Sequence, residues 1–201
     1  PIHVPSMPAL ADELDPALFQ AHSAAYRSPT GVPDGTVLVV GGGNTGFQIA
    51  KELSATNTVH LAVGSRQTPL PQRLLGRDLF SWLTRLGLLD KSVDSRLGRR
   101  ARDRDTLIGS SPLELRRAFG VVLRPRAVGG SGRTVRFADG TQLDVDAVVW
   151  ATGYRPDHAW IGLDIADGNG RLRHGRGVSA TRGLYFLGLT WQHTRGSALL
   201  G

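Results

Sequence analysis

The stretch VLVVGGGNTGFQIAKEL, residues 37–53, decides how the chain folds. An apolar run typical of a buried strand leads into three consecutive glycines, and apolar residues at helical spacing follow them. Flanks of this kind distinguish a nucleotide-binding glycine turn from glycines that only reverse the chain. We predict a strand at 36–40, a turn at 41–43 and a helix at about 45–54.

A second match to the pattern shows why the flanks matter. Glycine is common in the chain, with 26 in 201 residues, so G-x-G-x-x-[GA] also arises by chance. Gly175, Gly177 and Ala180 fit it, but no apolar strand precedes them and no helical pattern follows. We therefore assign dinucleotide binding to residues 41–46 alone.

Each glycine of the first match has its own expected role. Gly41 allows a tight turn, Gly43 lets backbone N–H groups approach a pyrophosphate, and Gly46 lets the helix pack close to the strand. Asn44 and Thr45 complete the expected cofactor-binding stretch at the start of the helix, where unpaired N–H groups attract an anion. A purely structural turn is the alternative.

The strand expected at 58–63 indicates which dinucleotide binds. A site for NAD has an acidic residue about 20 residues after the glycines, which accepts a hydrogen bond from the ribose 2′-OH. No acidic residue occurs from 53 to 77, and the strand instead leads into Ser65 and Arg66. Arg66 can bind a 2′-phosphate bidentately and Ser65 can donate to it, so we predict NADPH. Arg66 as an ordinary surface residue is the alternative.

The composition excludes several classes of site. The chain has no cysteine, which excludes disulfides and a redox-active C-x-x-C pair. Its six histidines are scattered along the sequence, so we expect no metal site. No apolar run is long enough to cross a bilayer, and the first residues do not resemble a secretory signal. We therefore expect a cytoplasmic protein without membrane contact.

The positive charge is partly concentrated in one stretch. The net charge is +7, and residues 66–104 hold ten basic and four acidic side chains, a local excess of 10 − 4 = +6. A solvated surface, a phosphate-rich ligand and a nucleic acid are the alternatives. No nucleic-acid-binding motif supports the last, so we expect no nucleic-acid partner.

Further strands and helices follow the glycine turn. Ser111 begins a short helix, Asp139-Gly140 turns a hairpin, and apolar strands are expected at 147–151 and 183–189. Strands that alternate with helices indicate a parallel sheet. The predicted fold class is α/β, with a Rossmann-like doubly wound parallel sheet.

Five segments in order resemble the flavin-containing monooxygenase group of flavoproteins, especially its bacterial single-chain relatives. They span nearly the whole chain, and the set is more specific than any one of them. The segments are HSAAYR (22–27), VVGGGNTG (39–46), VGSRQTPLPQRLLGRDLF (63–80), ATGYRPD (151–157) and GLYFLGLTWQH (183–193).

The resemblance implies an NADPH domain that is inserted into a split FAD domain. It divides the chain into a connecting segment at 1–30, an NADPH-binding Rossmann-like domain at 31–145, and an incomplete, C-terminal part of the FAD-binding domain at 146–201. Both cofactors, FAD and NADPH, are therefore expected.

The resemblance also implies further cofactor-binding residues. Thr152, Gly153 and Tyr154 match a strand-end turn that lies near both cofactors. Gln192 and His193 match the end of a loop that closes over the flavin.

Two departures indicate a divergent relative. In the family's sequence F-x-G-x-x-x-H-x-x-x-[YF]-[RK], His22, Tyr26 and Arg27 fit, but Pro16 and Leu18 stand where Phe and Gly should be.

The second departure concerns the FAD fingerprint. Residues 1–30 contain no glycine, so they cannot supply the family's N-terminal glycine pattern. We therefore expect a chain that lacks the first FAD lobe and is inactive alone. Without that lobe, parts of the apolar segments AVVWA and LYFLGL should be exposed. Homo-oligomerisation is left open.

The leading hypothesis is an FAD- and NADPH-dependent monooxygenase that acts on a small organic substrate and O2 through a flavin hydroperoxide. No catalytic side chain is expected, because the cofactor supplies the chemistry. His22 and His193 are expected to be structural or to contact a cofactor. A flavin-dependent reductase or dehydrogenase and a non-catalytic NADPH-binding fragment are the alternatives.

Overall fold

The computed structural model describes residues 2–64, 68–70, 73–74, 76–87, 95, 106–108, 111–168, 170–189 and 192–194. Contacts between residues divide the chain into two compact units. The first unit contains residues 1–71 and 106–157, and the second contains residues 72–105 and 158–201.

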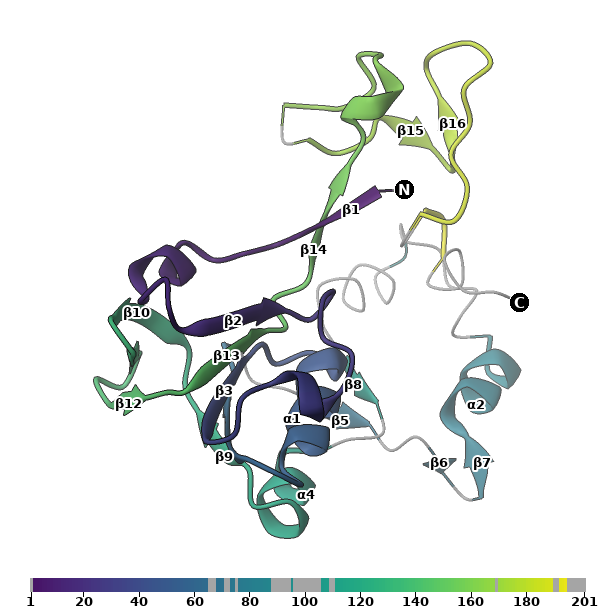
Figure 1. Cartoon of the computed structure of the whole chain (residues 1–201). Helices are drawn as coiled ribbons and strands as arrows, with labels where there is room; N and C mark the ends of the chain where they lie inside the picture. The colour runs from purple at the N-terminus through teal and green to yellow at the C-terminus, as the bar shows by residue number, and fades with distance from the viewer. Residues whose placement is uncertain are drawn as a thin grey trace. The chain divides into compact units, whose positions relative to one another are not determined.

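A five-stranded sheet forms the centre of the first unit (Figure 1). All four strand pairings in it are parallel. In spatial order the strands are β2 (Phe19–His22), β13 (Ala147–Trp150), β3 (Thr36–Val40), β4 (Thr58–Ala62) and β9 (Val122–Arg124). From β3 the chain continues to β4 and β9 on one side of the sheet, whereas β13 lies on the other side of β3. The strand order therefore reverses beside β3. The predicted Rossmann-like parallel sheet is confirmed.

Helices cover one face of this sheet. Helix α1 (Asn44–Leu53) buries Phe47, Ala50 and Leu53 in a cluster with β3, β4 and β13, because its apolar residues recur at helical spacing. Helix α4 (Pro112–Ala118) adds Leu115 to the same cluster. Leu107 joins it from β8 (Thr106–Ile108), which pairs in parallel with β5 (Thr68–Leu70).

The predicted cap of helix α4 is present. The Ser111 hydroxyl oxygen accepts a hydrogen bond from the backbone N–H of Glu114 at 3.1 Å. The Glu114 carboxylate lies 3.6 Å from the ammonium of Lys51, an exposed contact that ties α4 to α1.

An antiparallel meander covers the other face of the sheet. Its strands are β10 (Ala127–Ser131), β11 (Thr134–Phe137) and β12 (Gln142–Asp144). Val135 and Phe137 are buried against Leu38 and Trp150 of the central sheet. The predicted hairpin turn is confirmed, because Asp139 accepts hydrogen bonds from Thr141 and Gly140 has φ +82°.

The N-terminal segment contains more regular structure than its sequence indicates. Besides β2 it forms β1 (Ile2–Pro5), which pairs antiparallel with β14 (Tyr154–Asp157), and two short 3-10 helices, η1 (Ala9–Glu13) and η2 (Pro29–Gly31). Strand β2 pairs with the edge of β13, and the helices and the meander pack on its two faces, so AVVWA is fully buried along residues 147–150. The expectation that AVVWA exposes apolar surface is therefore wrong.

The second unit has short elements. They are β6 (Arg73–Leu74), β7 (Arg77–Asp78), α2 (Leu79–Arg85), η3 (Ala159–Ile161), β15 (His174–Gly175) and β16 (Val178–Ser179). The strand predicted at 183–189 is absent from the described residues, where Tyr185 makes only one isolated bridge, to Val178. Tyr185 and Leu187 are 71% and 92% exposed, as expected for LYFLGL.

In the part of the chain that the structure describes, no helix is both long and apolar enough to cross a membrane. The same residues contain no group of three or more His, Asp or Glu side chains that could hold a metal ion.

Candidate dinucleotide site at the carboxyl edge of the sheet

The parallel strands direct several predicted site segments to one edge of the sheet. Their carboxyl ends lie at the same edge because every pairing is parallel. The glycine turn follows β3, and Thr152 and Gly153 follow β13, its neighbour. Ligands of open α/β sheets bind outside the carboxyl ends, where the strand order reverses. In this sheet the reversal lies beside β3.

The glycine turn packs directly against the end of β13. The backbone N–H of Gly41 donates to the Ala62 carbonyl at 3.0 Å, and Gly41 has φ +141°, which L side chains rarely adopt. A Cβ on Gly41 would lie only 2.1 Å from the Ala151 carbonyl oxygen. A Cβ on Gly46 would lie 2.0 Å from the Gly41 carbonyl oxygen, so α1 passes immediately over the turn. At both positions the lack of space for a Cβ is by itself enough to require glycine.

The start of helix α1 is suited to an anion. Gly43 is the N-cap residue and has extended backbone angles, φ −83° and ψ 176°. It has no side chain with which to cap the helix, and the first turn, which contains Asn44 and Thr45, holds no acidic residue. The first N–H groups of an α-helix have no partner within the helix, and the helix dipole adds partial positive charge there. Together these features attract a phosphate group.

The turn after β13 is held by the N-terminal segment. The Gly153 carbonyl accepts hydrogen bonds from the Ser6 N–H at 2.9 Å and from His22 Nε2 at 3.0 Å. The His22 Nδ1 atom accepts from the Ala24 N–H at 3.1 Å, so the proton of this buried ring lies on Nε2. The Thr152 hydroxyl donates to the Ser6 carbonyl.

Tyr154 completes this turn. Its ring meets that of His22 edge to face, with the two centroids 5.1 Å apart. Gly153 has φ +79°, and a Cβ on it would meet no atom within 4 Å. Glycine is therefore needed at this position for its backbone conformation rather than for space.

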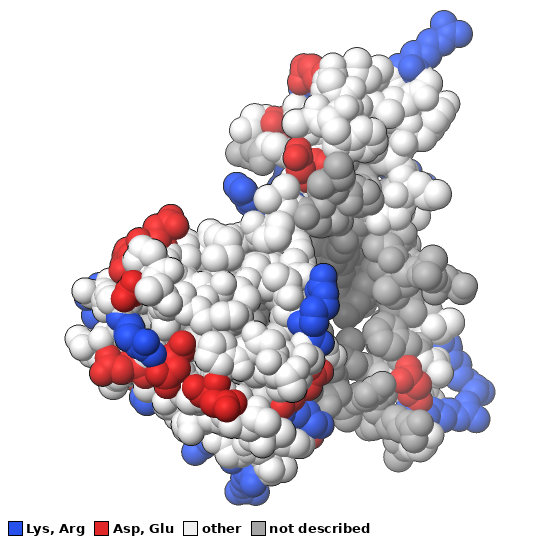
Figure 2. Space-filling model, viewed as in Figure 1, with Lys and Arg blue, Asp and Glu red and all other residues white. Residues whose placement is uncertain are grey.

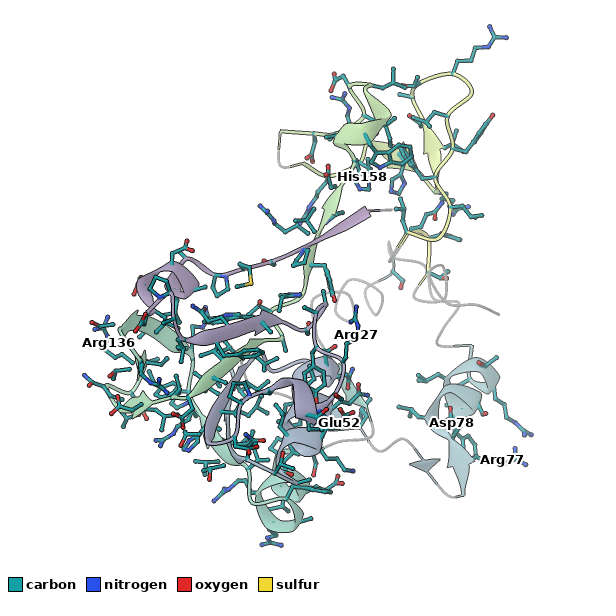
Figure 3. The ribbon with its side chains drawn as sticks, in the orientation of Figure 1. Arg27, Glu52, Arg77, Asp78, Arg136 and His158 are labelled. Carbon is teal, nitrogen blue, oxygen red and sulfur yellow. The ribbon has the colours of Figure 1, made fainter. Side chains whose placement is uncertain are left out.

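The other residues that match the family sequence connect to α1. The Tyr26 hydroxyl donates to the Glu52 carboxylate at 3.1 Å, and Figure 3 shows Glu52 on α1. Burial, and then the hydrogen bond to Glu52 and its charge, raise the pKa of Tyr26 to about 12, so this hydroxyl keeps its proton. Arg27 bonds to the Ala24 and Tyr26 carbonyls of its own turn. These three matching residues (His22, Tyr26 and Arg27) thus all make hydrogen bonds within the fold.

The two residues predicted to bind the 2′-phosphate, Ser65 and Arg66, lie outside the described residues, as does most of the basic stretch 66–104. The preceding residue, Gly64, is described, and its carbonyl accepts a hydrogen bond from the Arg126 guanidinium at 3.1 Å. Sequence reasoning missed Arg126, since only its place after a predicted strand could have indicated it.

The surface around the first unit shows no basic face in the view of Figure 2. Acidic and basic side chains are interspersed there over the described residues.

Gln192 belongs to the second unit, and its side-chain amide forms hydrogen bonds with the backbone of its own loop. Its Nε2 donates to the Phe186 carbonyl at 2.6 Å, and its Oε1 accepts from the Leu189 N–H at 3.2 Å. His193 follows it, partly buried. Gln192 and His193 belong to the second compact unit, and the glycine turn belongs to the first.

The second glycine match is a hairpin turn. Arg176 and Gly177 lie between β15 and β16 with φ 51° and 93°, typical of a two-residue turn. A Cβ on Gly177 would lie 1.8 Å from the Gln192 Nε2 atom. This position therefore lacks the strand–turn–helix context, as predicted, but it is important for local packing.

Comparison with known proteins supports the interpretation of the fold. No family model matches the chain. An uncharacterized CzcO-like oxidoreductase of Geobacillus kaustophilus is 39% identical over 203 residues, which cover 100% of this chain and 58% of that protein. The uncharacterized oxidoreductase CzcO of Bacillus subtilis is 37% identical over 202 residues, covering 100% of this chain and 59% of that protein. The chain thus spans somewhat less than two thirds of the length of these relatives.

Monooxygenases appear among both the curated relatives and the solved structures. Rice indole-3-pyruvate monooxygenase YUCCA8 is 29% identical over 216 residues, which cover 90% of this chain and 50% of that protein. The structure of the flavin-containing monooxygenase from Stenotrophomonas maltophilia is 26% identical, with a TM-score of 0.68, and the match covers 97% of this chain and 56% of that one. With its parallel sheet and glycine turn, the chain is similar to oxidoreductases and flavin monooxygenases.

Proposed function

We propose that this chain forms the NADPH-binding part of a flavin-dependent monooxygenase that acts on a small organic molecule. The observation that carries the proposal is the packing of the Gly41–Gly46 turn against Ala151 where the strand order reverses. Relatives that are named as oxidoreductases and monooxygenases give the reaction class. We assign residues 31–145 to the NADPH domain and residues 146–201 to part of the FAD domain.

The residues of the turn fit a dinucleotide pyrophosphate. Gly41 and Gly46 keep the turn and the helix close together, so that backbone N–H groups of the first helical turn, at Gly43, Asn44 and Thr45, would face the phosphates. The lack of acidic residues in the first turn avoids repulsion of the anion. The Ser65 hydroxyl and the Arg66 guanidinium would bind the 2′-phosphate.

FAD would supply the oxygen chemistry, with NADPH as its reductant. In this chain the turn at Thr152, Gly153 and Tyr154 adjoins the glycine turn through Ala151, so one side of a flavin would lie near the nicotinamide. We assign Gln192 and His193 as further flavin contacts. We propose cytoplasmic location and no nucleic-acid partner for the same protein.

Calorimetric titration with NADPH and NADH tests the proposal. We expect NADPH to bind more tightly than NADH, and Gly43→Val to abolish binding of both without unfolding the protein. A protein that binds neither coenzyme would contradict the proposed site. Equal affinity for the two would contradict the choice of NADPH.

A further inference from the structure

Two chain segments leave the sheet side by side next to the glycine turn. Strands β4 and β9 are parallel neighbours, with Ala62 opposite Arg124. The pairing continues one residue further, because the Val63 N–H donates to the Arg124 carbonyl at 2.9 Å. Gly64 and the pair Pro125-Arg126 therefore emerge together at the carboxyl edge of the sheet.

The Arg126 side chain lies against Gly64. Its Nη2 donates to the Gly64 carbonyl at 3.1 Å, and a Cβ on Gly64 would be only 3.2 Å from its Nε. The side chain is exposed, and no ion pair joins it to a carboxylate within the described part of the chain. A guanidinium carries five N–H donors in a planar fork, so one contact with Gly64 leaves others available to a ligand.

The side chain of Arg124, two residues earlier, makes its contacts within the fold. Its Nε donates to His60 Nδ1 at 3.1 Å, and its guanidinium carbon lies 5.6 Å from the centroid of the Phe137 ring. Burial, and then the charge of Arg124, lower the pKa of His60, which keeps the ring neutral and able to accept this bond. Arg124 thus fixes the end of β9, from which Arg126 departs.

The backbone of Arg126 is also fixed on the side of the meander. Its carbonyl accepts a hydrogen bond from the Ala138 N–H at 2.8 Å. The position of this arginine is therefore set by β4, β9 and β11 together. A cation that is held in place loses less conformational freedom when it binds an anion.

We propose that Arg126 is a second contact of the coenzyme's 2′-phosphate and so helps to select NADPH over NADH. The inference rests on the proposed function. In this type of fold the pyrophosphate lies at the glycine turn after one strand, and the adenosine ribose reaches the end of the next strand, here β4. Arg126 is held beside Gly64 at that end, where its remaining guanidinium donors can bind a phosphate.

The test uses two probes that differ only in the 2′-phosphate, 2′,5′-ADP and 5′-AMP, measured by calorimetry on the 201-residue protein. Arg126→Gln should weaken the binding of 2′,5′-ADP by about 10- to 100-fold and change the affinity for 5′-AMP by no more than about twofold. Arg126→Lys should recover part of the loss, because it keeps the charge without the planar fork. Arg136→Gln is the matched control, since Arg136 is an exposed arginine on β11 (Figure 3) and should leave both affinities unchanged.

The outcomes separate this inference from the proposed function. Equal losses for the two probes would mean that Arg126 only supports the loop, and would overturn the inference. If Arg126→Gln changes neither affinity and the variant still prefers 2′,5′-ADP, the inference is overturned, but the proposed NADPH site is not contradicted. A wild-type protein without preference for 2′,5′-ADP would overturn both. Thermal denaturation of each variant checks that the fold is retained.

Discussion

Gly41 and Ala151 are so close that a Cβ on the glycine would lie 2.1 Å from the alanine carbonyl oxygen. They are 110 residues apart in sequence, but β3 and β13 are neighbours in the sheet, and the Ala151 N–H donates to the Val40 carbonyl at 2.8 Å. The glycine turn and the start of the Thr152-Gly153-Tyr154 turn are consequently in direct contact through Ala151.

Gly41→Ala should therefore unfold or strongly destabilise the protein. The substitution combines a backbone conformation that alanine rarely adopts with a clash against backbone, for which we expect a loss of about 3 kcal/mol in the free energy of unfolding. Gly153→Ala is the matched comparison, because its φ is +79° but its Cβ would meet no atom within 4 Å. We expect it to cost about 1 kcal/mol. Chemical denaturation of the two variants measures both values, and equal losses would contradict the packing described here.

Gly43→Val should remove dinucleotide binding without loss of stability. Gly43 has extended backbone angles that valine adopts readily, so the effect of the new side chain is to block the approach of the pyrophosphate. Gly175→Val is the control, since Gly175 belongs to the second glycine match and a Cβ there meets nothing within 4 Å. Gly177 is unsuitable for this purpose because it packs against Gln192. Coenzyme binding that survives Gly43→Val would refute the assignment of the turn.

Arg66→Ala tests the choice of coenzyme directly. Loss of a charge-assisted, bidentate contact should weaken NADPH binding by about 1.5–3 kcal/mol and leave NADH nearly unchanged. Titration of both coenzymes against both proteins measures the difference. If the two affinities fall equally, Arg66 does not contact the 2′-phosphate.

The stability of the protein should fall as the pH drops below about 6.5. The folded-state pKa of His60 lies below its ordinary value of 6.5, because of burial and then the charge of Arg124. Below pH 6.5 the unfolded chain therefore binds more protons at this position than the folded one, and the free energy of unfolding decreases towards the folded-state pKa. His60→Gln should make the decrease shallower, which denaturant titrations between pH 5 and pH 7.5 can measure. An unchanged slope would show that other groups cause the effect.

Local sequence signals predicted the elements that depend on local chemistry. The strand, turn and helix at 36–54, the Ser111 cap and the Asp139-Gly140 hairpin each rest on neighbouring residues, and all are present. The site turn could be anticipated for the same reason.

Features that depend on distant partners were missed. Strand β2 has no strong pattern and becomes ordered by pairing with β13, about 130 residues away. Arg126 reaches Gly64 across 62 residues, and nothing near it in the sequence specifies that contact. Conversely, LYFLGL has a strand-like composition but makes only an isolated bridge among the described residues. Propensity alone does not create a strand without a neighbour.

The 201-residue chain should retain no flavin. A flavin dinucleotide needs its own pyrophosphate site, and such sites use a glycine turn at the start of a helix. Within the described residues from 146 onward, Gly153 is followed by strand β14, and no glycine begins an α-helix. Incubation with excess FAD, desalting and measurement of the flavin absorbance should therefore show a colourless protein. A chain extended to the length of the Geobacillus relative, of which these residues span 58%, should retain FAD and consume O2 with NADPH. Stoichiometric flavin on the 201-residue chain would instead mean that Thr152, Gly153 and their surroundings suffice to hold it.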